Sequence, residues 1–136
     1  MLHAKRNSGF TLIELLVVAA LVIILSGLSI VNFRGSSQKT RNSKREADIS
    51  QVRSALELYR AGNQTYPIYS SANTTLNFQN LINNAAFTPY LATQNLVDPT
   101  NATPYLYEYQ SAANGFSYSI CYTIEPSATQ TCLANP

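Results

Sequence analysis

The feature that most constrains this chain is a long apolar run near its N-terminus. Nineteen consecutive residues without a charge extend from 15 to 33, and one carboxylate, Glu14, stands at their front. As a helix they would be about 28 Å long, close to the hydrocarbon thickness of a bilayer. We therefore expect a membrane-spanning or filament-core helix over residues 10–33. We also expect a specific partner for Glu14, because a charge inside a bilayer costs about 2.5–3.5 kcal/mol.

A short basic leader, residues 1–9, precedes the run. It contains Lys5 and Arg6 and ends at Gly9. An ordinary secretory signal peptide is one interpretation, with its cleavage site near residues 26–29. Two features count against that interpretation. Glu14 interrupts the front of the apolar region, and Gly9 lies before this region, where a signal peptidase does not cut.

Charge is distributed unevenly along the chain. All nine Lys and Arg residues lie at or before Arg60, whereas residues 61–136 contain only three acids, Asp98, Glu108 and Glu125. The sequence therefore predicts a basic stalk that carries a faintly acidic head. Because the head has no cation for a phosphate backbone, we expect no strong nucleic-acid binding by it.

The six residues that begin at Gly9 form a recognisable motif. Residues 9–14, Gly-Phe-Thr-Leu-Ile-Glu, resemble the processing motif of type IV pilins and type II secretion pseudopilins. The resemblance implies that a prepilin peptidase cuts between Gly9 and Phe10 and that the new N-terminus, Phe10, is methylated. It also implies that Glu14 pairs with the N-terminal ammonium of Phe10 in a neighbouring subunit. Two opposite charges in an apolar environment compensate each other's desolvation, so this pairing would favour assembly.

The segment after the apolar run is strongly helical in pattern. Residues 34–61 form the predicted stalk helix, with Gly62 and Asn63 as its C-cap. One apolar stripe runs along a face of this helix at Ile49, Val52, Leu56 and Tyr59. The charged residues of 34–60 are interpreted as a solvated helix face, in preference to a patch for lipid or nucleic acid.

The head, residues 62–136, is predicted to be α+β. Apolar spacing predicts a short helix near residues 76–84, and alternation predicts strands over residues 105–109 and 116–124. These two runs would form an antiparallel hairpin whose apolar face covers the stripe of the stalk. The expected fold is thus a long N-terminal helix with a small antiparallel sheet packed on its C-terminal half, the pilin fold.

Two cysteines, Cys121 and Cys132, lie near the C-terminus. In an exported head we expect a disulfide between them, and free thiols are the alternative. Alternation places Cys121 on the outer face, so the bond would pin the C-terminal tail across the outside of the sheet. It would stabilise the fold by roughly 3 kcal/mol in the chain-entropy model. No metal site is expected, because two cysteines without a nearby histidine cannot complete a tetrahedral shell.

A weaker resemblance extends over residues 10–110. Short motifs recur in the order typical of G-type major pseudopilins and small pilins: 47–49, 55–59, 66–67, 89–91, 98–99 and 104–105. The G-type family also has a C-terminal calcium site built from acidic loop residues. The tail after Glu125 contains no carboxylate side chain, and Ca²⁺ takes six to eight oxygen ligands. We therefore do not expect that site here, nor any other cofactor.

Together these features predict an assembling protein and not an enzyme. The head lacks His, Lys and Arg and offers no paired acids, so acid–base and nucleophilic catalysis lack their usual groups. The resemblance implies a chain that spans the inner membrane once and then joins a helical homopolymer at the cell surface or in the periplasm. It implies four kinds of partner: other copies of the chain, prepilin peptidase, an inner-membrane assembly platform with its ATPase machinery, and minor pilins.

Three functions remain open from the sequence. The first expectation is a structural subunit of a type IV pilus-like filament, which the disulfide-closed tail and the missing calcium ligands favour. The alternative is a type II secretion pseudopilin that acts as a periplasmic piston for protein export, which the motifs of residues 47–105 favour. A monomeric membrane-anchored binding domain is the alternative from another class.

Overall fold

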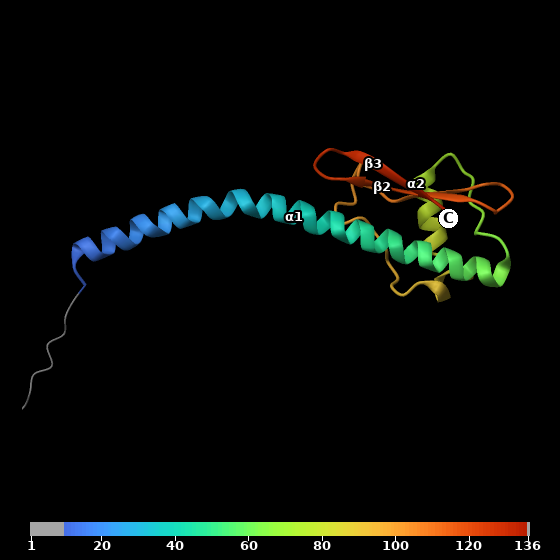
Figure 1. The fold of residues 1–136 in the computed structure, drawn as a ribbon, viewed down its shortest axis with the longest axis horizontal. Coiled ribbons are helices and arrows are strands. Elements are labelled where there is room, and N and C mark those ends of the chain that lie inside the picture. The colour runs from blue at the N-terminus through green and yellow to red at the C-terminus, as the bar shows by residue number, and fades with distance from the viewer. Residues whose placement is uncertain (1–9, 136) are drawn as a thin grey trace, which may run out of the picture. The chain divides into compact units, whose positions relative to one another are not determined.

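A computed structural model of the chain describes residues 10–135, and for residues 28–34 it describes the backbone alone. The expected leader and Gly9 lie outside the described residues. The chain divides into two compact units, residues 1–37 and residues 38–136. The first contributes the N-terminal part of one helix, and the second contains the rest of that helix with the head (Figure 1).

Helix α1 extends over Leu12–Asn63. It begins two residues after the predicted start at residue 10 and ends two residues after the predicted end at residue 61, because Gly62 and Asn63 stay helical and do not cap it. The turn to the head is made by Gln64, which adopts a left-handed conformation with φ 64°. The last carbonyls are satisfied locally: the Gln64 amide donates to the Arg60 carbonyl at 2.7 Å, and the Asn63 side chain donates to the Tyr59 carbonyl at 2.9 Å.

Helix α2 extends over Thr74–Ile82, two residues ahead of the predicted range. It begins there because the side chain of Asn73 accepts a hydrogen bond from the amide of Leu76 at 2.9 Å. This is an ordinary N-cap, which satisfies one of the free amides at a helix start. A short 3₁₀ helix, Thr88–Tyr90, follows.

A three-stranded antiparallel sheet completes the head, in the order β1-β2-β3. Its strands are β1 (Glu108–Ser111), β2 (Tyr118–Ile124) and β3 (Thr129–Ala134). The predicted hairpin is confirmed in the pairing of β1 with β2, where Tyr109 lies opposite Ile120. Both strands are shifted relative to the prediction. The turn between them occupies residues 112–117, so Phe116 lies in the turn and is 58% exposed.

Strand β3 was not predicted as a strand. Its sequence, Thr-Gln-Thr-Cys-Leu-Ala, lacks the alternation of apolar residues that marks a half-buried strand. It becomes one by pairing with β2 along six residues. The expectation that the tail crosses the outside of the sheet is therefore wrong, because the tail lies beside β2 as an edge strand.

The core forms where the sheet and α2 meet α1. Ile49, Val52 and Leu56 are buried in one cluster with Tyr109 and Ile120, and Tyr59 packs against it. The predicted stripe is thus the surface that the head covers, and the expected α+β fold is confirmed. Edge-to-face aromatic pairs fill the cluster, for example the rings of Tyr66 and Tyr118, whose centroids are 4.7 Å apart.

Candidate functional site

The N-terminal part of α1 exposes a continuous apolar surface. Every large apolar side chain from Phe10 to Leu25 is exposed, from 82% for Phe10 to 50% for Val17. Contiguous exposed apolar surface of this kind marks contacts with proteins or lipid. The surface is therefore the candidate assembly site. Among the residues that the structure describes, no helix combines the length and the apolarity that crossing a membrane requires.

Glu14 caps the helix on which it stands. Its Oε2 accepts hydrogen bonds from the amide and the hydroxyl of Thr11, at 3.2 and 3.1 Å. The Glu14 amide donates in return to the Thr11 hydroxyl at 3.3 Å. This reciprocal arrangement is a capping box, in which a Thr and a Glu three residues later satisfy free amides at the helix start. Within a single chain, Glu14 thus has a partner on its own helix.

Thr11 was missed as a functional residue in the sequence analysis. The signal was present, because Thr11-Leu-Ile-Glu14 has the Thr-x-x-Glu spacing of a capping box directly before an apolar run. The box holds the Glu14 carboxylate toward the N-terminal end of α1. Phe10, whose amine would pair with a neighbour's Glu14, lies at that same end.

A buried ion pair fastens the head to α1. The side chains of Arg45 and Asp98 are both 0% exposed and form a two-point contact, Nε to Oδ2 at 2.6 Å and Nη2 to Oδ1 at 3.0 Å. The Thr100 amide donates to Asp98 Oδ1 at 2.7 Å. Arg45 also donates to Thr100 Oγ1 at 2.9 Å. Full hydrogen bonding of this kind compensates the desolvation of buried charges.

Glu125 extends this ion pair into a cluster of four charges. Its carboxylate accepts hydrogen bonds from Arg45 Nη2 at 2.8 Å and from both Nε and Nη2 of Arg41. The Arg41 guanidinium, followed by that of Arg45, holds the pKa of Glu125 at about 2, below its usual range. Hydrogen bonds from Arg45, first to Asp98 and then to Glu125, raise the pKa of Arg45. We call these four residues, Arg41, Arg45, Asp98 and Glu125, the charge clasp.

The charge clasp corrects one interpretation of the sequence. Arg45 was assigned to a solvated helix face, yet it is among the most buried side chains of the chain. Acids of the same helix are engaged as well: Asp48 accepts a hydrogen bond from the Tyr107 hydroxyl at 2.9 Å. These polar side chains fix how the head lies on residues 38–63 of α1.

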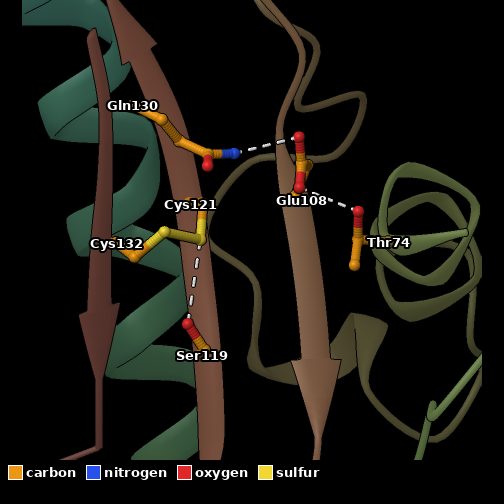
Figure 2. Close-up of a disulfide and its surroundings, with 6 residues drawn as sticks. All are labelled: Thr74, Glu108, Ser119, Cys121, Gln130 and Cys132. Atoms are coloured by element: carbon orange, nitrogen blue, oxygen red, sulfur yellow. Dashed lines mark hydrogen bonds between the residues drawn. A yellow bond between two sulfur atoms is a disulfide. The ribbon is translucent and has the colours of Figure 1, made fainter. Parts of the chain in front are cut away.

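The two cysteines form a disulfide on the face of the sheet away from α1 (Figure 2). Cys121 of β2 and Cys132 of β3 lie directly opposite each other in the register. On the same face, the Glu108 carboxylate of β1 accepts hydrogen bonds from Thr74 of α2 at 2.8 Å and from Gln130 of β3 at 3.1 Å. The edge strand is therefore fastened both covalently and through Glu108. Within the described residues, no cluster of His, Cys, Asp or Glu is suited to hold a metal ion.

Comparison with known proteins places this chain in a family. Residues 32–124 match the sequence model of type II secretion system (T2SS) protein G. The chain belongs to this family. Residues 4–30 also match the prokaryotic N-terminal methylation motif, so both resemblances noted in the sequence are confirmed. The family match ends before β3, so Cys132 lies beyond it.

Curated relatives carry the same description. Type II secretion system core protein G of Aeromonas hydrophila is 36% identical over 66 residues, which are 48% of this chain and 46% of the relative. That of Pectobacterium carotovorum subsp. carotovorum is 37% identical over 62 residues, or 46% of this chain and 40% of the relative. That of Vibrio cholerae is 33% identical over 67 residues, which are 49% of this chain and 46% of the relative. The chain thus spans less than half the length of these relatives. No solved structure matches it.

The relatives help to choose between the two filament functions expected from the sequence. From the sequence, a type IV pilus subunit is the first expectation and a type II secretion pseudopilin is the alternative. The family match and the relatives support the second better than the first.

Proposed function

We propose that the chain is a pseudopilin, a subunit that polymerises through its N-terminal helix into a short filament for protein export. The observation that carries this proposal is the exposed apolar surface of residues 10–25, in a chain of the protein G family. Such a surface requires a cover of lipid or of other helices. A membrane before assembly and neighbouring helices after it supply that cover in turn.

Assembly begins with processing in this proposal. A prepilin peptidase cuts between Gly9 and Phe10, and Phe10 is methylated at its new amine. The chain is held in the inner membrane by residues 10–33 until an assembly platform and its ATPase draw it into the filament. In the filament the apolar helices lie inside and the heads outside, with minor subunits as further partners. The chain performs no chemistry of its own.

Glu14 changes partners during this assembly. In the single chain its carboxylate accepts hydrogen bonds from Thr11. In the filament it pairs with the ammonium of Phe10 in a neighbouring copy, which compensates two buried charges at once. The capping box keeps the carboxylate satisfied before that exchange.

The test is assembly of the full chain together with a prepilin peptidase and a type II secretion machine. Mass spectrometry of the product should find an N-methylated Phe10 at its N-terminus. Electron microscopy and crosslinking should find filaments and ladders of subunits, which Glu14→Ala should abolish while leaving the amount of membrane-bound chain unchanged. Normal assembly of Glu14→Ala would contradict the role of Glu14, and monomers alone in wild-type crosslinking would support a monomeric membrane-anchored domain.

A surface pilus is the second candidate function. The disulfide-closed tail favours it, because β3 and Cys132 lie outside the part of the chain that matches protein G. The two filaments differ in length and place. Long fibres shed from wild-type cells at natural expression would favour the pilus, whereas loss of a secreted protein without such fibres would favour the pseudopilin.

A further inference from the structure

The acids of the head do not fit the calcium site that the resemblance to G-type pseudopilins implies. Ca²⁺ takes six to eight oxygen ligands, and the tail after Glu125 contains no carboxylate side chain. Glu108 lies on the face of the sheet that bears the disulfide, where it accepts hydrogen bonds from Thr74 and Gln130. Asp98 and Glu125 meet at α1 instead, in the charge clasp.

Oxygen atoms surround the guanidinium of Arg45 in the charge clasp. Five of them accept hydrogen bonds from its nitrogens. They are both carboxylate oxygens of Asp98 at 2.6 and 3.0 Å, Asn42 Oδ1 at 2.7 Å, Glu125 Oε1 at 2.8 Å and Thr100 Oγ1 at 2.9 Å. Carboxylate, amide and hydroxyl oxygens are also the ligands that hard metal cations take. The site is therefore lined as a cation site is, and a side chain of α1 fills it.

The Arg45 side chain is fixed in this position. It is 0% exposed, and its Cζ lies 5.0 Å from the centroid of the Tyr105 ring, within the range of a cation–π contact. One turn earlier on α1, the Asn42 side chain donates to the Glu125 carbonyl at 2.8 Å and accepts from the Glu125 amide at 3.1 Å. A metal ion could reach these oxygens only by expelling a buried side chain.

The charges of the clasp are already balanced. The carboxylates of Asp98 and Glu125 face two guanidinium groups, of which that of Arg45 is enclosed and that of Arg41 lies at the rim, with its side chain 36% exposed. A divalent cation added to this cluster would leave an uncompensated double positive charge, whose partial burial is costly. The charge balance therefore disfavours a calcium ion even beside the clasp.

We propose that the Arg45 guanidinium is the resident cation of this oxygen-lined site, so that the head folds without the calcium ion that the family resemblance implies. The guanidinium joins α1 to residues 98–100 and to Glu125 directly after β2, as a metal ion joins loops through shared ligands. A cation that belongs to the chain is not lost when the calcium concentration falls. The inference concerns the head alone and applies to either of the two filament functions.

The first experiment is thermal unfolding of the full wild-type chain in detergent, with its disulfide intact, in excess calcium chloride and in excess chelator. The two midpoints should agree. A ligand present at 100 times its dissociation constant would raise the midpoint of a domain of this size by about 10–20 °C, so a required calcium ion would be detected. A midpoint that falls in chelator and recovers with calcium would overturn the inference.

The second experiment removes the resident cation. Arg45→Met should lower the midpoint in chelator, because Asp98 and Glu125 lose the cation that they share. Calcium chloride should restore part of the loss, because the variant releases the oxygens around position 45. Arg53→Met is the matched control, since Arg53 lies about 12 Å further along α1 and its side chain reaches the Ala134 carbonyl at 3.5 Å. Its midpoint should not respond to calcium.

The outcomes of the second experiment separate a cation site from an ordinary ion pair. A folded Arg45→Met variant that does not respond to calcium would overturn the assignment of these oxygens as a cation site. A calcium response of Arg53→Met would overturn it as well, because calcium would then act elsewhere on the chain. The wild-type comparison stays decisive if Arg45→Met does not fold. Neither experiment involves filaments, so its failure leaves the pseudopilin function intact.

Discussion

Arg45 and Asp98 are 53 residues apart in the sequence and form an ion pair that is completely buried between α1 and the head. Removal of one partner leaves the other charge buried without compensation, which typically costs 3–5 kcal/mol. Breaking the pair should therefore cost more free energy of unfolding than the loss of its hydrogen bonds alone.

Asp98→Asn should destabilise the head by about 3–5 kcal/mol, because the Arg45 guanidinium would lose its buried countercharge. Denaturant unfolding of the full chain in detergent, followed by tyrosine fluorescence, measures this change. Glu46→Gln is the control, since Glu46 is exposed on the same helix, and its effect should stay within about 0.5 kcal/mol. Equal destabilisation by the two variants would show that the buried pair stabilises the head no more than an exposed charge does.

Lowering the pH should reduce the stability of the head, because it protonates Glu125. Its pKa is about 2 in the folded chain and 4.5 as an ordinary value, so the unfolded chain takes up the proton first. The stability from this group is complete above pH 4.5 and is lost as the pH falls from 4.5 toward 2, on the order of 1–3 kcal/mol. Unfolding free energies measured across this range should fall less steeply for Glu125→Gln than for wild type. Parallel pH profiles would contradict the assignment.

Loss of the disulfide should lower stability without abolishing the fold. Cys121 and Cys132 enclose a short loop, with a sequence separation of 11, for which the chain-entropy model gives about 3 kcal/mol. The double variant Cys121→Ser/Cys132→Ser should unfold at lower denaturant, and the same shift should appear in wild type after reduction. Backbone pairing of β2 with β3 and the bonds of Glu108 remain, so hydrogen exchange should still protect β2. Complete unfolding on reduction would contradict this division of roles.

Gly115→Ala should destabilise the head by about 1–2 kcal/mol, because the residue has φ +69° and a Cβ would crowd Thr65 and the Tyr66 carbonyl. Gly35→Ala is a control with the opposite sign. Gly35 lies within α1 with open space around it, so alanine should raise helix stability by up to about 1 kcal/mol. Thermal unfolding of both variants measures the two shifts. Tolerance of alanine at position 115 would show that the turn adapts.

Much of the fold follows from local patterns. The stripe at Ile49, Val52 and Leu56 lies on one helix face whatever covers it, and alternation identifies β2 within two residues of its start. The short motifs shared with the family acquire a physical meaning in the structure. Glu57 accepts a hydrogen bond from the Tyr66 hydroxyl, so the motifs at 55–59 and 66–67 are the two sides of one contact between α1 and the head. Asp48 of the motif at 47–49 accepts a hydrogen bond from Tyr107, which lies outside the motifs.

Some features of the candidate site can also be predicted from local sequence, and others cannot. The apolar run and Glu14 are visible in the sequence because a charge at the front of nineteen uncharged residues is anomalous by itself. The capping box of Thr11 was equally local and could have been read from its spacing. The cluster of Arg41, Arg45, Asp98 and Glu125 could not, because its acids come from loops far from α1 in the sequence.

The sequence by itself determined the apolar N-terminal helix, the stalk stripe and the hairpin, because each depends on periodicity within one segment. Only the tertiary structure decided that Arg45 is buried and that the tail is a strand. A helical arginine becomes a core residue when Asp98 and Glu125 converge on it from distant loops. A polar tail becomes β3 when β2 offers it a free edge and Cys121 a partner for Cys132. Both outcomes depend on contacts between residues far apart in the chain, which no local pattern records.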